Sequence, residues 1–112
     1  MTEVLATDAF ALWYRNLDDT DIEEVTRVVD ILQIQGPRLG YPQSSSIAGS
    51  SIALRELRVQ SKGRPLRIFY AFDPARQAVL LIGGDKTGDK RFYQRMTPIA
   101  ERLWQEYLDD KN

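Results

Sequence analysis

Basic residues stand where a predicted sheet would bring positive charge close to a phosphate group. Arg58 and Arg67 lie in two segments that read as neighbouring strands, and Lys86 follows a third strand. Arginine within an otherwise apolar strand is costly unless it is paired or binds a ligand. The spacing of these cations therefore predicts a binding site for an anionic phosphate ligand. Tyr93, in a following helix, is expected to lie on the same face. The alternative is a structural salt bridge, for example to Glu56.

Two residue types are missing from the 112-residue chain, which contains no cysteine and no histidine. Their absence excludes disulfides, zinc–thiolate sites, cysteine nucleophiles, Ser–His–Asp triads and histidine-ligated metal sites. Any general acid or base must be Asp, Glu, Lys or Tyr. No apolar run approaches the roughly 20 residues that span a bilayer, and the N-terminus does not read as a signal peptide. We therefore expect a cytoplasmic protein with no membrane contact.

The charges are unevenly distributed, although the formal net charge is only −1. Residues 1–54 hold three basic and eight acidic side chains, whereas residues 55–95 hold ten basic and four acidic ones. A continuous basic stretch is the electrostatic footprint that binding to a phosphate-bearing ligand requires. The alternative is that the helices are acidic and the strands happen to be basic.

Apolar spacing predicts two helices before a long connector. The first begins at a cap on Asp8, and the second runs from Asp19 or Thr20 to about Gln35, where Gly and Pro follow as stop signals. From there to about Ser51 the chain is rich in Gly, Pro and Ser and has no periodic pattern. Such connectors in small domains are often functional or mobile.

Three strands and a last helix complete the predicted order. The strands are Leu54–Gln60, Leu66–Phe72 and Gln77–Ile82, and the turns between them are short, which predicts antiparallel neighbours. Alternation places Arg67 opposite Ile68, on a face that we expect to meet solvent. The last helix begins around Asp89 or restarts at Thr97–Pro98. With residues 3–6 as a further edge strand, this order predicts one α+β domain over residues 1–112.

The segment GGDKTG at 83–88 resembles a phosphate-binding loop at first sight. It lacks the full G-x-x-x-x-G-K-[ST] spacing and has no parallel strand after it. We therefore interpret it as a glycine-rich turn that leaves the sheet and leads into a helix.

The strings LRELR (54–58) and RIFYAFDPARQAVLLIGGDK (67–86), followed by FY (92–93) and an amphipathic last helix, carry a family resemblance. They resemble the HigB-like, phage Gp49-type branch of the RelE/ParE toxin superfamily, over about Phe10 to Leu108. The resemblance implies a compact α+β fold in which two N-terminal helices pack on a small antiparallel sheet with a C-terminal helix.

The resemblance also implies a function, that of the toxin of a bacterial type II toxin–antitoxin pair. Such toxins are mRNA interferases, endoribonucleases that usually cut mRNA on the ribosome. They need no metal or cofactor and use the neighbouring 2′-hydroxyl as nucleophile, which leaves a 2′,3′-cyclic phosphate. The implied partners are mRNA and a helix-turn-helix, HigA-like antitoxin, with which the toxin would form a heterotetramer.

Carried over by position, the resemblance implies four catalytic residues. Arg67 would stabilise the phosphorane-like transition state, and Arg58 would bind phosphate or assist the 2′-hydroxyl. Lys86 would assist the leaving 5′-oxygen, and Tyr93 would stack on or orient the RNA. Further RNA-binding positions are Arg55, Lys62, Arg64, Lys90 and Arg91.

The chain departs from the family's enzymes in two ways. The paired lysines of RelE-type strands are absent, and Glu56 stands in one of their places. The histidine and aspartate used by some HigB toxins have no clear counterpart other than Asp85 or Asp89.

Two other functions fit the same scaffold, because fold alone does not select a function. One is a ParE-like toxin that does no chemistry and poisons DNA gyrase. The other is a degenerate phage-derived protein that only binds an antitoxin. The basic 55–95 stretch with Tyr93 favours the ribonuclease, since a gyrase binder does not need an arginine facing out of the sheet.

Overall fold

The computed structural model describes residues 1–111 and has the predicted α+β class. Its elements in chain order are β1 (Val4–Ala6), α1 (Asp8–Arg15), α2 (Asp19–Gln35), a short 3-10 helix (Gly36–Arg38), β2 (Ser44–Ser46), β3 (Arg55–Ser61), β4 (Arg64–Phe72), β5 (Ala78–Asp85) and α3 (Phe92–Asp110). Within the described residues, no helix combines the length and apolar character needed to cross a membrane.

The five strands form one sheet in the order β1-β5-β4-β3-β2. Strands β2 to β5 pair antiparallel, but β1 runs parallel to β5, with Val4 opposite Ala78. The sheet is therefore mixed, and the prediction of a purely antiparallel sheet is wrong at this edge. Helices α1 and α2 follow β1 in the chain, so no hairpin forces β1 to run against its neighbour.

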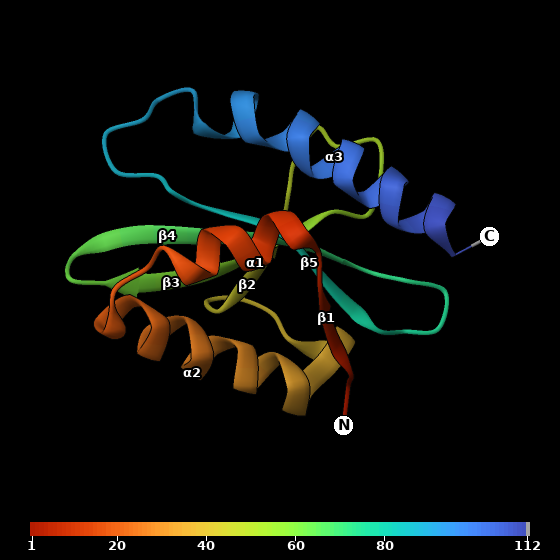
Figure 1. Cartoon of the computed structure of the whole chain (residues 1–112), viewed down its shortest axis with the longest axis horizontal. Coiled ribbons are helices and arrows are strands. Elements are labelled where there is room, and N and C mark those ends of the chain that lie inside the picture. Colours follow the sequence, from red (N-terminus) through yellow and green to blue (C-terminus); the bar gives the residue numbers. More distant parts are fainter. Residues whose placement is uncertain (112) are drawn as a thin grey trace.

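Side chains from the two sheet faces enter two separate apolar clusters. Leu66, Ile68 and Tyr70 of β4 pack with residues of α1 and α2, whereas Phe69 and Ala71 pack with residues of α3. Figure 1 shows α2 and α3 on opposite sides of the sheet, with α1 lying against β5. Both faces of β4 are consequently covered by helices.

This arrangement corrects one expectation about the candidate site. Arg67 does point opposite Ile68, but it is only 4% exposed, because the face that it shares with Phe69 is the face covered by α3. The prediction that Arg67 faces solvent is therefore wrong.

The helix boundaries differ slightly from those predicted. Thr7, one residue before Asp8, caps α1 by accepting a hydrogen bond from the Phe10 N–H. Asp18 caps α2 in the same way. The last helix begins at Phe92 and continues through Pro98 without a new start. Side-chain oxygens at the caps satisfy backbone N–H groups that have no partner within the helix.

The connector predicted to lack periodic structure contains β2. Its three serines pair with residues 55–57 of β3 through the backbone. The Ser44 and Tyr70 hydroxyls lie 2.5 Å apart in the core, so this short strand is tied to β4 as well. A run of serine has no apolar alternation, and this is why the pattern did not reveal a strand.

The prediction that Gly83 and Gly84 lie in a turn after the sheet is wrong, because both residues belong to β5. A Cβ atom on Gly83 would lie 2.4 Å from the Trp13 ring, and one on Gly84 would lie 2.9 Å from the Phe92 ring. The pair therefore lets one aromatic ring from α1 and one from α3 pack directly on the strand.

We expect the substitution Gly83→Ala to destabilise the protein. The added methyl group meets the Trp13 ring, and overpacking of this kind costs roughly 1–3 kcal/mol. Thermal unfolding followed by circular dichroism should show a lower melting temperature. Gly40→Ala is the matched control, because a Cβ there meets nothing within 4 Å. Equal melting temperatures for the two variants would contradict this account of β5.

Candidate active site

A buried carboxylate, Glu56, lies at the centre of a polar cluster between the sheet and α3. The Tyr93 hydroxyl donates to its Oε1 at 2.6 Å, and the Ser45 hydroxyl donates to its Oε2 at 2.8 Å. The Arg58 Nη1 lies 3.5 Å from Oε2, and the Arg67 Nε lies 3.6 Å from Oε1. We call these five residues the Glu56 cluster.

The register of two strands produces the cluster. In β3, Leu57 packs in the core with α2, so its neighbours Glu56 and Arg58 point to the other face. Arg58 lies directly opposite Arg67 in the antiparallel β3–β4 pair. Like charges opposite one another repel, and the Glu56 carboxylate between them offsets this repulsion.

The Arg67 Nε faces the Glu56 carboxylate as an ion pair but makes no hydrogen bond with the described residues. The Arg67 Nη1 donates to the Leu66 carbonyl at 3.0 Å, whereas the Nε is buried. Glu56 balances the charge of this guanidinium, but a buried donor without a hydrogen bond is still costly. An oxygen of an anionic ligand could complete the hydrogen bonding of the guanidinium.

The fourth predicted catalytic residue, Lys86, lies against the cluster. Its Nζ stands 5.2 Å from the centroid of the Tyr93 ring, within the range of a cation–π contact. The Lys86 backbone N–H donates to the Pro65 carbonyl, which fixes the chain where it leaves β5. The structure therefore brings Arg58, Arg67, Lys86 and Tyr93 together.

Three of the five predicted RNA-binding residues lie elsewhere. Arg55 is on the opposite face of β3, where it donates to the Ser44 hydroxyl. Lys62 pairs with Asp18, the cap of α2, and with Asp21 of that helix. Arg64 pairs with Asp21 and with Asp85. These three cations already have partners away from the Glu56 cluster.

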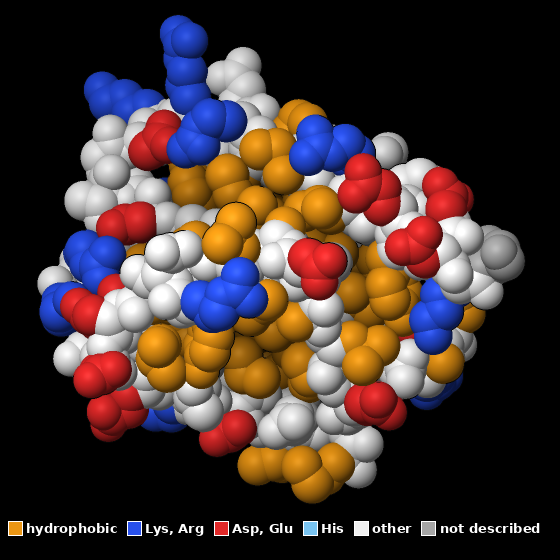
Figure 2. Space-filling model, viewed as in Figure 1, with side chains coloured by type: hydrophobic (Ala, Val, Ile, Leu, Met, Phe, Trp, Pro, Cys, Tyr) orange, Lys and Arg blue, Asp and Glu red, His pale blue; other side chains and the backbone are white. Residues whose placement is uncertain are grey.

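Lys90 and Arg91 are exposed on the loop that joins β5 to α3. Figure 2 shows basic side chains gathered at the corner of the molecule where Figure 1 draws this loop. Because Lys86 begins the same loop, these two residues extend positive charge outward from the Glu56 cluster. Asp89 of this loop pairs with Arg95 instead.

The sequence pointed to Glu56 only as the partner of a structural salt bridge, which the structure confirms for both Arg58 and Arg67, and it did not point to Ser45. A usable signal was present, because Glu56 is the one acidic residue in the segment 55–72, which otherwise carries five basic residues. Ser45 had no comparable signal, since its role depends on the pairing of β2 with β3.

Two hollows adjoin the cluster. One, of about 300 Å³, is lined by Arg58 and Arg67 together with residues of α2 and of the loop before β2. The other, of about 310 Å³, is lined by Glu56 and Tyr93 together with residues 46–48. A ligand that binds the arginines therefore has space beside the cluster.

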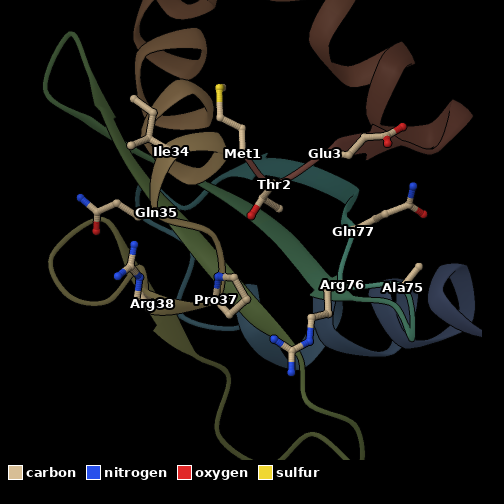
Figure 3. Close-up of a pocket in the computed structure, with 10 residues that line it drawn as sticks. All are labelled: Met1, Thr2, Glu3, Ile34, Gln35, Pro37, Arg38, Ala75, Arg76 and Gln77. Atoms are coloured by element: carbon tan, nitrogen blue, oxygen red, sulfur yellow. The ribbon is translucent and has the colours of Figure 1, made fainter.

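A larger hollow, of about 570 Å³, lies at the start of β1, the end of α2 and the turn before β5. Figure 3 shows its lining side chains, which include Arg38, Arg76 and Glu3 but none of the predicted site residues. Within residues 1–111 no group of three or more carboxylates is placed to hold a metal ion.

The environment of Tyr93 changes its acidity. Burial raises the pKa of the Tyr93 phenol, and the hydrogen bond to the Glu56 carboxylate raises it further. The neighbouring Arg67 cation acts in the opposite direction, because it favours the phenolate. Tyr93 is therefore a neutral hydrogen-bond donor at physiological pH.

Comparison with known proteins gives one family and two similar proteins. The family described as "Phage derived protein Gp49-like (DUF891)" matches residues 12–105, which include the whole Glu56 cluster. Both similar proteins come from Mycobacterium tuberculosis (strain ATCC 25618 / H37Rv).

One of these, named "Putative toxin HigB3", is 41% identical over 98 residues, which cover 86% of this chain and 84% of that protein. The other, named "Putative toxin HigB2", is 36% identical over 104 residues, which cover 90% of this chain and 52% of that protein. The chain thus spans about half the length of the second relative.

We expect Glu56→Gln to lower the pKa of Tyr93. The neutral amide no longer penalises the phenolate, while Arg67 still favours it. An ultraviolet absorbance titration, with the same titration of a Tyr93→Phe variant subtracted, measures this pKa. Glu101→Gln is the control, since that carboxylate binds Ser50 and Ser51 instead. A Tyr93 pKa unchanged by Glu56→Gln would show that the two side chains do not interact.

Proposed function

Since this chain belongs to the phage-derived Gp49-like family, in the branch of HigB-like toxins, we propose that it is the toxin of a type II toxin–antitoxin pair and cleaves mRNA. The observation that carries the enzymatic part is the pair of guanidinium groups, Arg58 and Arg67, held side by side with one buried donor that makes no hydrogen bond. We assign the cleavage site to the Glu56 cluster and Lys86.

The guanidinium pair suits one phosphate group of an RNA chain. Arginine presents planar donors that match phosphate oxygens in pairs, and Arg58 is 30% exposed so that a ligand can reach it. Because Arg67 is buried, its orientation does not speak against a gyrase poison. The Arg67 Nε, which contacts Glu56 but makes no hydrogen bond, favours the ribonuclease, because a phosphate oxygen could complete the hydrogen bonding of this guanidinium.

The proposed reaction transfers the phosphate within the RNA. The 2′-hydroxyl oxygen bonds to phosphorus, the bond from phosphorus to the 5′-oxygen breaks, and a 2′,3′-cyclic phosphate and a 5′-hydroxyl result. The proton lost by the 2′-hydroxyl is balanced by the one gained at the 5′-oxygen. Arg58 and Arg67 stabilise the charge that grows on the phosphate, which is electrostatic preorganisation.

The remaining groups have positioning and proton-transfer roles in this proposal. Lys86 supplies a proton to the leaving 5′-oxygen, and Tyr93 orients the RNA. Glu56 holds both arginines and the Tyr93 hydroxyl in place through its two carboxylate oxygens. The proposed chemistry needs no metal ion, because three cationic side chains surround one phosphate.

We expect loss of either guanidinium to slow mRNA cleavage on the order of 10²–10³-fold. Arg58→Ala removes the accessible cation, and Arg67→Lys retains the buried charge that Glu56 needs while removing the planar donors. Cleavage is mapped by primer extension on translating ribosomes, with EDTA expected to change nothing. Circular dichroism checks folding.

Arg102→Ala is the matched control, because Arg102 is an exposed arginine whose partner is Glu106 on the same helix. It should cut mRNA at the rate of the unmodified protein. Folded Arg58→Ala and Arg67→Lys variants that also cut at that rate would refute the proposed site. Intact mRNA together with blocked gyrase supercoiling would favour the ParE-like function instead.

We also expect expression of the chain alone to arrest growth, and co-expression of a helix-turn-helix protein encoded beside it to restore growth. The reason is the similarity to two proteins named as toxins, since toxins of such pairs are neutralised by a cognate antitoxin. Colony counts after induction measure the effect. Normal growth with abundant soluble protein and no antitoxin would contradict the toxin assignment.

A further inference from the structure

Tyr41 is a large aromatic side chain that the fold leaves in solvent. It is 77% exposed, although tyrosine usually buries most of its ring. It lines the same 300 Å³ hollow as Arg58 and Arg67, together with the amide side chains of Gln43 and Gln60. An exposed ring is therefore placed beside the two guanidinium groups of the candidate site.

The position of Tyr41 is fixed by its neighbours in the chain. The Ser44 N–H donates to the Gly40 carbonyl at 3.0 Å, which closes a turn around Tyr41. The Arg58 N–H donates to the Gln43 carbonyl at 2.8 Å, which attaches the turn to β3. The exposed Tyr41 ring is therefore carried by a turn that backbone hydrogen bonds hold in place.

Arg58 also contacts the ring directly. Its guanidinium carbon lies 5.2 Å from the centroid of the Tyr41 ring, so the cation covers one face. With the residue 77% exposed, the other face is open for stacking. The same arginine therefore orients an aromatic surface and reaches the proposed phosphate position.

The charges around the hollow select the kind of ligand. Its lining residues are Arg27, Val28, Tyr41, Pro42, Gln43, Arg58, Gln60 and Arg67, which include three cations and no acid. Stacking on an aromatic ring beside such cations is how proteins bind single-stranded nucleic acid. The glutamine amides can both donate to and accept from the edge of a base.

We propose that Tyr41 is a base-binding residue, on whose open face the nucleobase next to the cleaved phosphate stacks. This inference rests on the proposed RNA cleavage and names the part of the substrate that the hollow holds. Tyr41 sets where the RNA lies along the cluster, and Arg58 links the stacked base to the phosphate.

The test measures binding without cleavage. The full chain is titrated into a short fluorescent 2′-O-methyl RNA oligonucleotide, which lacks the attacking hydroxyl, at fixed salt, and fluorescence anisotropy reports the affinity. We expect Tyr41→Ala to weaken binding about tenfold or more, as loss of a base–aromatic stack does. Tyr41→Phe keeps the ring face and should bind like the unmodified protein.

Leu12→Ala is the control for removal of an exposed apolar side chain, because Leu12 is 56% exposed on α1, outside the hollow. If the unmodified protein cuts mRNA and Tyr41→Ala binds and cuts equally well, the role of Tyr41 is wrong and the proposed function stands. If the unmodified protein neither binds the oligonucleotide nor cuts mRNA, both fail. If Tyr41→Ala keeps RNA affinity but is no longer neutralised by the antitoxin, the hollow is a protein-binding surface instead.

Discussion

The Glu56 carboxylate is almost fully buried, so protein groups must supply the hydrogen bonds and positive charge that water would otherwise provide. These groups come from separate elements: Ser45 from β2, Arg58 from β3, Arg67 from β4 and Tyr93 from α3. Burial of one acid therefore ties two neighbouring strands and the start of a helix to β3. The same contacts hold two like charges opposite one another, an arrangement that would be unfavourable without the carboxylate.

The start of α3 is fixed by a second constraint, the absence of side chains at Gly83 and Gly84. Strand β5 lies between β1 and β4 in the sheet, and its two glycines accept the Trp13 ring and the Phe92 ring. Phe92 also contacts Phe69 of β4, with ring centroids 5.9 Å apart. Because Tyr93 follows Phe92 in the chain, the packing of the Phe92 ring, which positions the start of α3, also places the Tyr93 phenol next to Glu56.

Apolar patterns predicted β3, β4 and β5 to within a few residues, because each of these strands buries at least one face. They did not reveal β2, whose serines pair through the backbone. Alternation placed Arg67 on the correct side of β4, but it carries no information about α3, which covers that side. The four candidate catalytic residues do lie together, whereas the central position of Glu56 depends on the β3–β4 register, which the sequence does not state.

The uneven distribution of charge along the sequence is explained in part by contacts between the acidic segment 1–54 and the basic segment 55–95. Lys62 and Arg64, at the β3–β4 turn, pair with acids at the start of α2, so the acidic N-terminal half neutralises this end of the basic stretch. Arg58 and Arg67 share the single carboxylate of Glu56, and Lys86 adds a third cation beside them. The Glu56 cluster and Lys86 therefore carry an excess of positive charge, three cations against one carboxylate. The interpretation of the charges as acidic helices against basic strands therefore describes the Asp21 end of the molecule, where acids at the start of α2 pair with Lys62 and Arg64.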